Sequence, residues 1–357
     1  MEKTTALYAY FGELGIFFDD IPGHTFYQIG LLDSISHNLG IDQFDFYNYL
    51  DEEAFDPNLP RPQFPDGLGS AVFTKYSDRL IDNYRIQYLK VLENIKEKKY
   101  SHVILKARFR NLSTLAKKIN DTHRFEQIIL AALDAGYDPS NIIILDTDLS
   151  LSDNFLNFVN EHKIKILTPS ISISAIGTNF IYDCLQWHKD NISSLSRNSN
   201  LFYYGNLDTS NYKPGHTKNK IIHEIIDTIS GVKTLYGQGF NLKIAAKETP
   251  LLGELIDTKK NVSLISRKER FEIWQAMETS LLSINVSKDK YIMAKFTPAR
   301  VYESVALGII PVSYKASTHP AMAFNDVDQF FEICKFLSEV SPTEYLDILE
   351  KVSSTLY

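Results

Sequence analysis

The stretch RVYESVALGIIPV, from Arg300 to Val312, decides the fold because it joins a helix pattern to a strand pattern. Arg300 and Glu303 lie three residues apart on its first half, and small or apolar residues follow them. Gly308 then occupies the position where a glycine commonly ends a helix. The apolar residues after it predict a strand. A helix that turns directly into a strand is the connection found in parallel sheets covered by helices.

The same alternation of apolar runs and amphipathic segments extends along the chain and predicts two α/β regions, each with a parallel sheet. The predicted strands are residues 4–14, 102–110, 141–150, 163–172, 200–206, 233–238, 281–287 and 309–314. The predicted helices are residues 26–40, 76–98, 124–136, 217–231, 270–280, 299–308 and 342–356.

A polar segment rich in Ser and Asn, residues 188–200, predicts a linker between two domains. We therefore expect an N-terminal domain at residues 1–187 and a C-terminal domain at 201–340. Residues 341–357 are expected to form a terminal helix that packs back towards the N-terminal domain. The fold class is thus α/β, with two Rossmann-like, doubly wound domains facing a cleft. In such sheets ligands bind at the carboxyl ends of the strands.

The composition is that of a soluble globular protein, with 44% hydrophobic and 23% charged residues among 357. The net charge of −7 argues against a nucleic-acid partner, although a local basic face can coexist with an acidic remainder. Cys184 and Cys334 form no metal-binding spacing, which favours a reducing compartment and no zinc site. The N-terminal sequence predicts neither a signal peptide nor a membrane span, so we expect a cytoplasmic protein.

Arg300 and Glu303 have two interpretations. On a helix they share one face and could form a surface ion pair worth a few tenths of a kcal/mol. Alternatively, the carboxylate could accept hydrogen bonds from the two hydroxyls of a ribose, and the guanidinium could bind phosphate or sugar oxygens. The spacing alone does not separate these interpretations.

A basic loop precedes the helix predicted at residues 217–231. It carries Lys213, and Lys218 lies at the start of the helix, where backbone N–H groups and the helix dipole favour an anion. A diphosphate would offset these lysines, whereas the alternative is a solvated basic loop. The Walker pattern is absent.

Three further positions are candidates for chemistry. Asp146 and Asp148 end a buried-looking strand, where either a general base or a turn-forming aspartate is found. His24 lies in the first loop between a strand and a helix, and such loops face the ligand. Lys106, Arg108 and Arg110 alternate along a strand end, which predicts either a strip that binds phosphates or a solvated edge.

Two Rossmann-like halves with the pattern R-x-x-E-x-x-x-x-G-x-x-P resemble the GT-B class of nucleotide-sugar glycosyltransferases. More specifically, the chain resembles the DNA β-glucosyltransferase family of T-even-type phages, which glycosylate 5-hydroxymethylcytosine with inversion, from a UDP-sugar. The segments that carry this resemblance are PGHTFYQIGLLDSI, NIIILDTDLSLS, LFYYGN with KNKIIHEIIDT, SLISRKERFEIW, and FTPARVYESVALGIIPV.

The resemblance implies roles for individual residues. Asp148 matches the catalytic base, and Glu303 matches the glutamate that binds the ribose. Donor binding is further implied for Arg300, Lys213, Lys218 and His24, and for Ile265, which lies in the segment whose backbone contacts the uracil. The family has arginines where this chain has Lys213 and Lys218. It has a sugar-contacting glutamate where this chain has His24. Related phages attach arabinose to their DNA instead of glucose, and an enzyme for a pentose would be expected to differ at this position. The resemblance therefore implies either arabinose or glucose as the transferred sugar.

The partners implied by the resemblance are double-stranded DNA containing 5-hydroxymethylcytosine and a UDP-sugar, UDP-arabinose or UDP-glucose. Lys106, Arg108 and Arg110 would contact DNA phosphates while the target base flips into the site. Mg²⁺ or Mn²⁺ could assist the departure of UDP, but no metal-binding residues are predicted. We expect a monomer without membrane contact, acting in the cytoplasm of the infected host cell. The alternatives are a UDP-glycosyltransferase for a small molecule, lipopolysaccharide or protein, and a non-enzymatic binding or anti-restriction protein.

Overall fold

The structure is a computed structural model of the 357-residue chain. It describes residues 3–11, 22–48, 64, 66–107, 122–146, 151, 153–168, 178–192, 199–205, 217–234, 236–246, 250–266, 270–287, 289–315 and 322–356.

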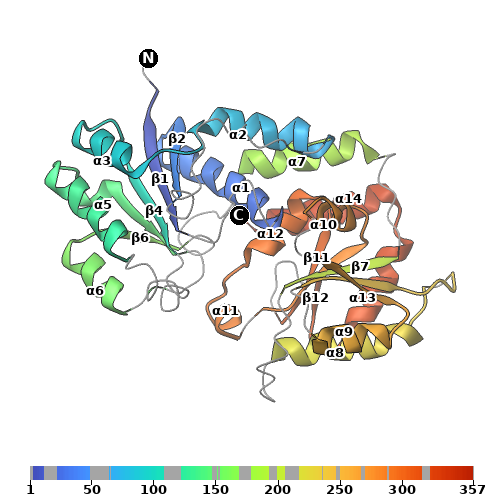
Figure 1. Cartoon of the computed structure of the whole chain (residues 1–357). Helices are drawn as coiled ribbons and strands as arrows, with labels where there is room; N and C mark the ends of the chain where they lie inside the picture. Colours follow the sequence, from blue (N-terminus) through green and yellow to red (C-terminus); the bar gives the residue numbers. More distant parts are fainter. Residues whose placement is uncertain are drawn as a thin grey trace. The chain divides into compact units, whose positions relative to one another are not determined.

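Two six-stranded parallel sheets organise the described part of the chain (Figure 1). The first has the strand order β3-β2-β1-β4-β5-β6, and the second has the order β12-β11-β10-β7-β8-β9. In each sheet the chain starts at the centre, winds to one edge, and returns to the centre to wind to the other. The order reverses between β1 and β4 in the first sheet and between β7 and β10 in the second. The prediction of two doubly wound sheets is confirmed.

The elements fall into two compact units. The first contains β1 (Thr5–Phe11), β2 (Gln43–Asn48), β3 (Ile81–Asn83), β4 (Val103–Ala107), β5 (Ile142–Leu145), β6 (Lys165–Leu167), α2 (Thr74–Leu80), α3 (Tyr88–Lys96), α5 (Thr122–Asp134) and α6 (Asp153–Glu161). In its apolar core cluster, β5 is completely buried and packs with residues of α3, α5 and α6. Helix α1 (Pro22–Leu39) is divided, since its residues from Leu31 onward belong to this unit.

The second unit contains the other described elements. These are β7 (Asn200–Tyr204), β8 (Asn241–Ala246), β9 (Val262–Ser266), β10 (Leu282–Asn285), β11 (Ile310–Tyr314), β12 (Ala323–Phe324), α7 (Thr178–Asp190), α8 (Thr217–Thr228), α9 (Pro250–Asp257), α10 (Arg270–Glu278), α11 (Asp289–Met293), α12 (Ala299–Ala306), α13 (Val327–Glu339) and α14 (Pro342–Ser354). Helices α8 and α9 lie on one face of the sheet, and α12 and α14 on the other (Figure 1).

The predicted domain limits can be compared with these units. Helix α7, which the sequence placed in the N-terminal domain and the first residues of the linker, belongs to the second unit. The terminal helix α14 packs against α7, α12 and β11. Tyr345 connects it to the sheet, because its hydroxyl donates to the carbonyl of Leu281 (2.6 Å) and accepts from the N–H of Ile310 (2.9 Å). Binding of the acceptor by the first domain and of the UDP-sugar by the second stays a prediction.

Three local predictions need correction. Residues 76–98 are not one helix: α2 ends at Leu80, and Ile81 pairs with Phe44 as strand β3 at the sheet edge. Strand pairing of Ile81 is therefore more favourable than continuing the helix that the sequence pattern predicted. The described residues among 233–238 belong to no named strand: Lys233 makes only an isolated bridge to Gly239, and β8 follows. Helix α1 begins at Pro22, the favoured first position for proline, so His24 lies in its first turn and not in a loop.

The connection from α12 to β11 has the predicted form. Gly308 has a φ of +75°, a left-handed conformation, and the N–H of Ile309 returns to the carbonyl of Ser304 (2.8 Å). The ring of His188, from α7, lies directly against Gly308 and its Nε2 is 3.0 Å from the carbonyl of Ala306. Position 308 thus requires glycine for two reasons: the backbone has a positive φ, and the neighbouring ring leaves no room for a Cβ.

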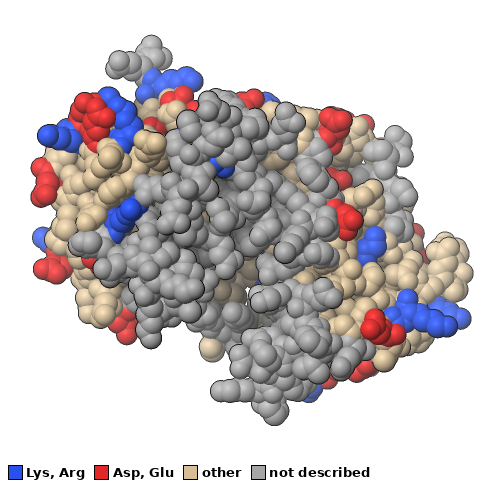
Figure 2. Space-filling view, in the orientation of Figure 1, with Lys and Arg blue, Asp and Glu red and all other residues tan. Residues whose placement is uncertain are grey.

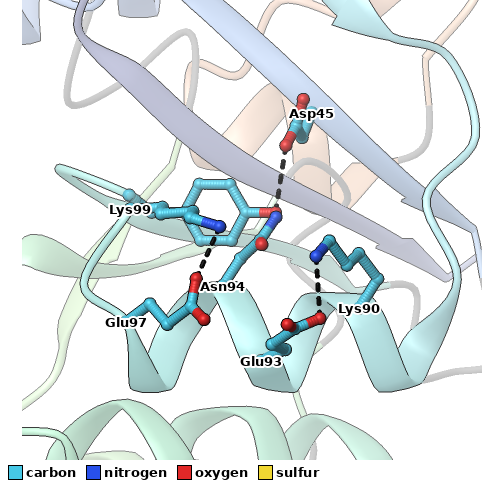
Figure 3. Close-up of polar contacts among 7 residues, drawn as sticks. Asp45, Lys90, Glu93, Asn94, Glu97 and Lys99 are labelled. Carbon is cyan, nitrogen blue, oxygen red and sulfur yellow. Dashed lines mark hydrogen bonds and ion pairs between the residues drawn. The ribbon is translucent and has the colours of Figure 1, made fainter.

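A buried polar network joins β2, β3 and α3 in the first unit, and Figure 3 shows its members Asp45 and Asn94. The hydroxyl of Tyr100 donates to Oδ2 of Asp45 (3.0 Å) and accepts from Nδ2 of Asn94 (3.0 Å), while Asn83 donates to the other carboxylate oxygen. Burial raises the pKa of Asp45. Burial and the adjacent Asp45 carboxylate raise the pKa of Tyr100, so its hydroxyl keeps its proton. This network is a structural feature that connects the middle of β2 with the segment between α3 and β4.

We predict that Gly308→Ala lowers the free energy of unfolding by more than about 2 kcal/mol, measured by equilibrium urea unfolding. An added Cβ would lie 2.7 Å from the His188 ring, and the positive φ disfavours any side chain. Gly40→Ala is the matched control, because Gly40 has a φ of +65° and no described atom within 4 Å of the new Cβ. It should cost only about 1 kcal/mol. Equal losses at both positions would contradict the contact with His188.

We predict that Tyr100→Phe destabilises the protein by about 1–3 kcal/mol near pH 7.5, and by less near pH 4. The raised pKa means that folding favours the protonated Asp45, whose titration contributes stability below its unfolded value of about 4. That contribution is lost as the pH rises through the folded-state pKa. The Tyr100 hydroxyl stabilises the charged carboxylate, so its removal costs most where Asp45 is ionised. Urea unfolding at both pH values measures this, with Tyr182→Phe, an exposed tyrosine, as control.

Candidate functional site

Helix α12 begins beside the carboxyl end of β7 and packs along β10, and the second sheet reverses direction between these two strands. Nη1 of Arg300 donates to the carbonyl of Tyr204, the last residue of β7 (3.0 Å). One turn further along the helix, the hydroxyl of Ser304 accepts from the hydroxyl of Ser283 on β10 (2.6 Å). In open α/β sheets this reversal point is where ligands bind.

Glu303 shares this place but is shielded from solvent, with 1% of its surface exposed. A surface ion pair with Arg300, the first of the two interpretations, is therefore excluded. Buried carboxylates are stable only with partners that hydrogen-bond to them. Tyr203, beside this pair on β7, is also buried, and burial raises its pKa to about 12 against the opposing charge of Arg300. The site thus combines a cation, a carboxylate and neutral hydroxyls in a region of low solvent access.

The predicted basic loop begins where Arg300 contacts the sheet. The chain leaves β7 through Gly205, which has a φ of +153°, and continues toward α8. Lys213 lies outside the described residues. Lys218 is in the first turn of α8, but its side chain also lies outside them. The position of Arg300 beside the start of this loop agrees with a shared anion, while the contribution of the two lysines stays a prediction.

Ile265 lies near the carboxyl end of β9, the edge strand, where it pairs with Ala245 of β8. It is two strands away from β7, on the same edge of the sheet as Arg300. Its role in binding the uracil stays a prediction.

The first unit places the remaining candidates. Lys106 is buried, 2% exposed, at the end of β4, and its ammonium lies over the ring of Tyr10 on β1, 5.2 Å from the centroid. This burial does not fit an exposed strip that binds phosphates. Arg108 and Arg110 lie outside the described residues. On the described part of the face in Figure 2, basic and acidic side chains intermingle, without a purely basic patch.

Of the two strand-end aspartates, only Asp146 lies within the described residues. Asp146 follows β5 at the carboxyl edge of the first sheet, is 8% exposed, and donates its N–H to the carbonyl of Leu167 (2.9 Å). Asp148 lies outside the described residues, as does the side chain of His24 on α1. The catalytic role of Asp148 and the donor role of His24 therefore stay predictions.

The sequence interpretation missed polar residues on β10 and β11. Asn285 ends β10, is 2% exposed, and donates from Nδ2 to the hydroxyl of Ser313 on β11 (3.1 Å). With Ser283 and Ser287 it forms a series at every second position, LLSINVS, within an otherwise apolar strand segment. Such a period places the polar side chains on one face, and this was the signal that could have identified them.

Other features of the described residues lie elsewhere. A cavity of about 420 Å³ opens at the amino ends of the second sheet, lined by Ser199, Leu281 and Tyr345 among others, and so at the edge opposite to Arg300. The described residues contain no group of three His, Cys, Asp or Glu side chains arranged for a metal ion. None of the helices within the described ranges has the length and apolar character needed to cross a membrane.

Comparison with known proteins gives similar structures only. No family model and no curated protein matches the chain. The DNA-modifying enzyme β-glucosyltransferase is 12% identical, covering 99% of this chain and 94% of that one, with a TM-score of 0.48. An α,α-trehalose 6-phosphate synthase from Burkholderia multivorans is 12% identical (99% and 93% covered, TM-score 0.46). A UDP-GlcNAc 2-epimerase from Methanocaldococcus jannaschii is 11% identical (95% and 94%, TM-score 0.39). All three TM-scores are below 0.5. The fold is established by the strand order of the two parallel sheets.

Proposed function

We propose that the chain is an inverting GT-B glycosyltransferase that transfers arabinose or glucose from a UDP-sugar to the hydroxymethyl group of 5-hydroxymethylcytosine in DNA. One observation carries the nucleotide part of this proposal: Arg300 and Glu303, one turn apart on α12, lie at the reversal point of the second sheet. Arg300 is held there by the carbonyl of Tyr204, and Glu303 is buried. The order of motifs along the chain supports the DNA acceptor.

In this mechanism the carboxylate of Asp148 takes the proton of the acceptor hydroxyl as its oxygen attacks the anomeric carbon. The bond between that carbon and the UDP oxygen breaks, and UDP leaves with the electron pair. Arg300, together with Lys213 and Lys218, stabilises the negative charge that grows on the diphosphate. Glu303 accepts hydrogen bonds from the ribose hydroxyls, and His24 lies on the side of the transferred sugar.

We predict that Asp148→Asn reduces turnover by about 10²–10⁴-fold. The assay incubates duplex DNA containing 5-hydroxymethylcytosine with UDP-glucose or UDP-arabinose and weighs the digested nucleosides. A gain of one hexose or one pentose identifies the sugar. Asp146→Asn is the control at the neighbouring strand-end carboxylate and should retain most activity. If Asp146→Asn were the inactive variant, the base would be Asp146 instead.

A second candidate, a UDP-glycosyltransferase for a non-DNA acceptor, is favoured by the net charge of −7 and by the burial of Lys106. These two observations weaken the expected phosphate contacts. They leave the nucleotide-binding part of the proposal unchanged, because Arg300 and Glu303 belong to the second unit.

The two candidates differ in DNA binding. With a DNA acceptor we predict affinity for the modified duplex that falls steeply with salt, and a slope that decreases by about one when Arg108 or Arg110 is replaced by alanine. Fluorescence anisotropy over a salt series measures this. Lys90→Ala, which removes an exposed lysine of α3, should leave the slope unchanged. The absence of binding even at low salt would favour the non-DNA acceptor.

A further inference from the structure

The polar face of β10 is oriented by one hydrogen bond. Ser283 donates to Ser304 of α12 (2.6 Å), so the face that carries Ser283 is directed toward this helix. Side chains two residues apart on a strand lie on the same face, which places Asn285 there as well. Ser287 follows two residues after the end of the strand. All three side chains are at least nine-tenths buried.

Two atoms of this face differ from the rest. Oδ1 of Asn285 and Oγ of Ser287 make no hydrogen bond to any residue in the described part of the chain, although each residue is only 2% exposed. The other end of the Asn285 amide is satisfied by Ser313. A buried polar atom without a partner destabilises a folded protein, so its presence requires an explanation.

The position of Asn285 supplies that explanation. Its predecessor Ile284 pairs with Tyr203, so Asn285 lies beside Tyr204, on strands about 4.8 Å apart. Tyr204 is the residue whose carbonyl receives Arg300. Asn285 therefore lies at the reversal point of the sheet, beside the residue that Arg300 contacts, and Ser287 follows two residues further along the chain. A ligand bound there would complete the hydrogen bonds of both atoms.

The chemistry of these atoms selects the part of the ligand. An amide oxygen only accepts hydrogen bonds, so it would repel a phosphate oxygen and requires a donor. A serine hydroxyl donates and accepts. The combination fits a sugar hydroxyl, and the adjacent Arg300 fits the diphosphate of the same ligand.

We propose that Asn285 and Ser287 bind a hydroxyl of the nucleotide sugar, in either the ribose or the transferred sugar. This inference rests on the proposed function and adds two binding residues to the same site. A structural role, such as hydrogen bonding to a buried water, predicts a different outcome when the atoms are removed: the free protein would lose stability and ligand affinity would not change.

The test measures two quantities for each variant: the midpoint of urea unfolding without ligand, and the Kd for UDP, UDP-glucose and UDP-arabinose by calorimetry. Ser287→Ala and Asn285→Ala should each weaken binding about three- to tenfold. Ser287→Ala removes a single unsatisfied oxygen, so its unfolding midpoint should stay unchanged or rise. Ser280→Ala is the matched control: Ser280 precedes β10 at the amino edge of the sheet, and its buried hydroxyl donates to the carbonyl of Ala276, so its removal should lower the midpoint and leave Kd unchanged.

The three ligands identify the source of the hydroxyl. Weaker binding of all three, UDP included, assigns it to the ribose, whereas an effect confined to the UDP-sugars assigns it to the transferred sugar. Wild-type protein that binds these ligands, with variants that bind equally well, overturns the inference but not the proposed function. Wild-type protein that binds none of the three overturns the proposed function and this inference with it.

Discussion

The hydrogen bond from Arg300 to the carbonyl of Tyr204 fixes the relation between α12 and the second sheet. A guanidinium has five donors, and using one on the backbone leaves the others for an anion. Under the proposed function, binding of the diphosphate would then cost less side-chain conformational entropy than binding to a mobile arginine. The orientation of Glu303 and Ser304 follows from the same contact, since all three residues belong to one short helix.

The burial around this contact determines what the site can do. Water competes poorly for hydrogen bonds in such a place, so a cation and a carboxylate act more strongly there than on a surface. The neutral hydroxyls and the amide of β10 and β11 form directional hydrogen bonds without adding charge to the site. A nucleotide sugar carries a diphosphate, which would bind the cation, and two sets of hydroxyls, which would bind the carboxylate and the neutral polar groups. Binding such a ligand would therefore require residues from several strand ends.

Much of the fold could be predicted from the sequence, because local and tertiary requirements agree there. Gly308 ends α12 by its own conformational preference, and the apolar run after it becomes β11. The prediction failed at Ile81, whose helical surroundings gave no sign of the sheet edge beside Phe44. The burial of Lys106 was not foreseen for a similar reason: strand alternation predicts which side a residue faces, but not whether another layer covers that side. The alternation in LLSINVS indicates a shared polar face, but not the hydrogen bonds that this face makes, and for that reason Asn285 was overlooked.

Tyr345 has a consequence for how the second unit forms. Its hydroxyl is shared by Leu281, just before β10, and Ile310, the first residue of β11, so two adjacent strands depend on a side chain of the terminal helix. During synthesis these strands leave the ribosome well before that helix does. The amino edge of the sheet is therefore completed late, and until then its backbone groups must be satisfied by water or by a chaperone. Folding of this unit is thus expected to follow synthesis of α14 and not to proceed strand by strand.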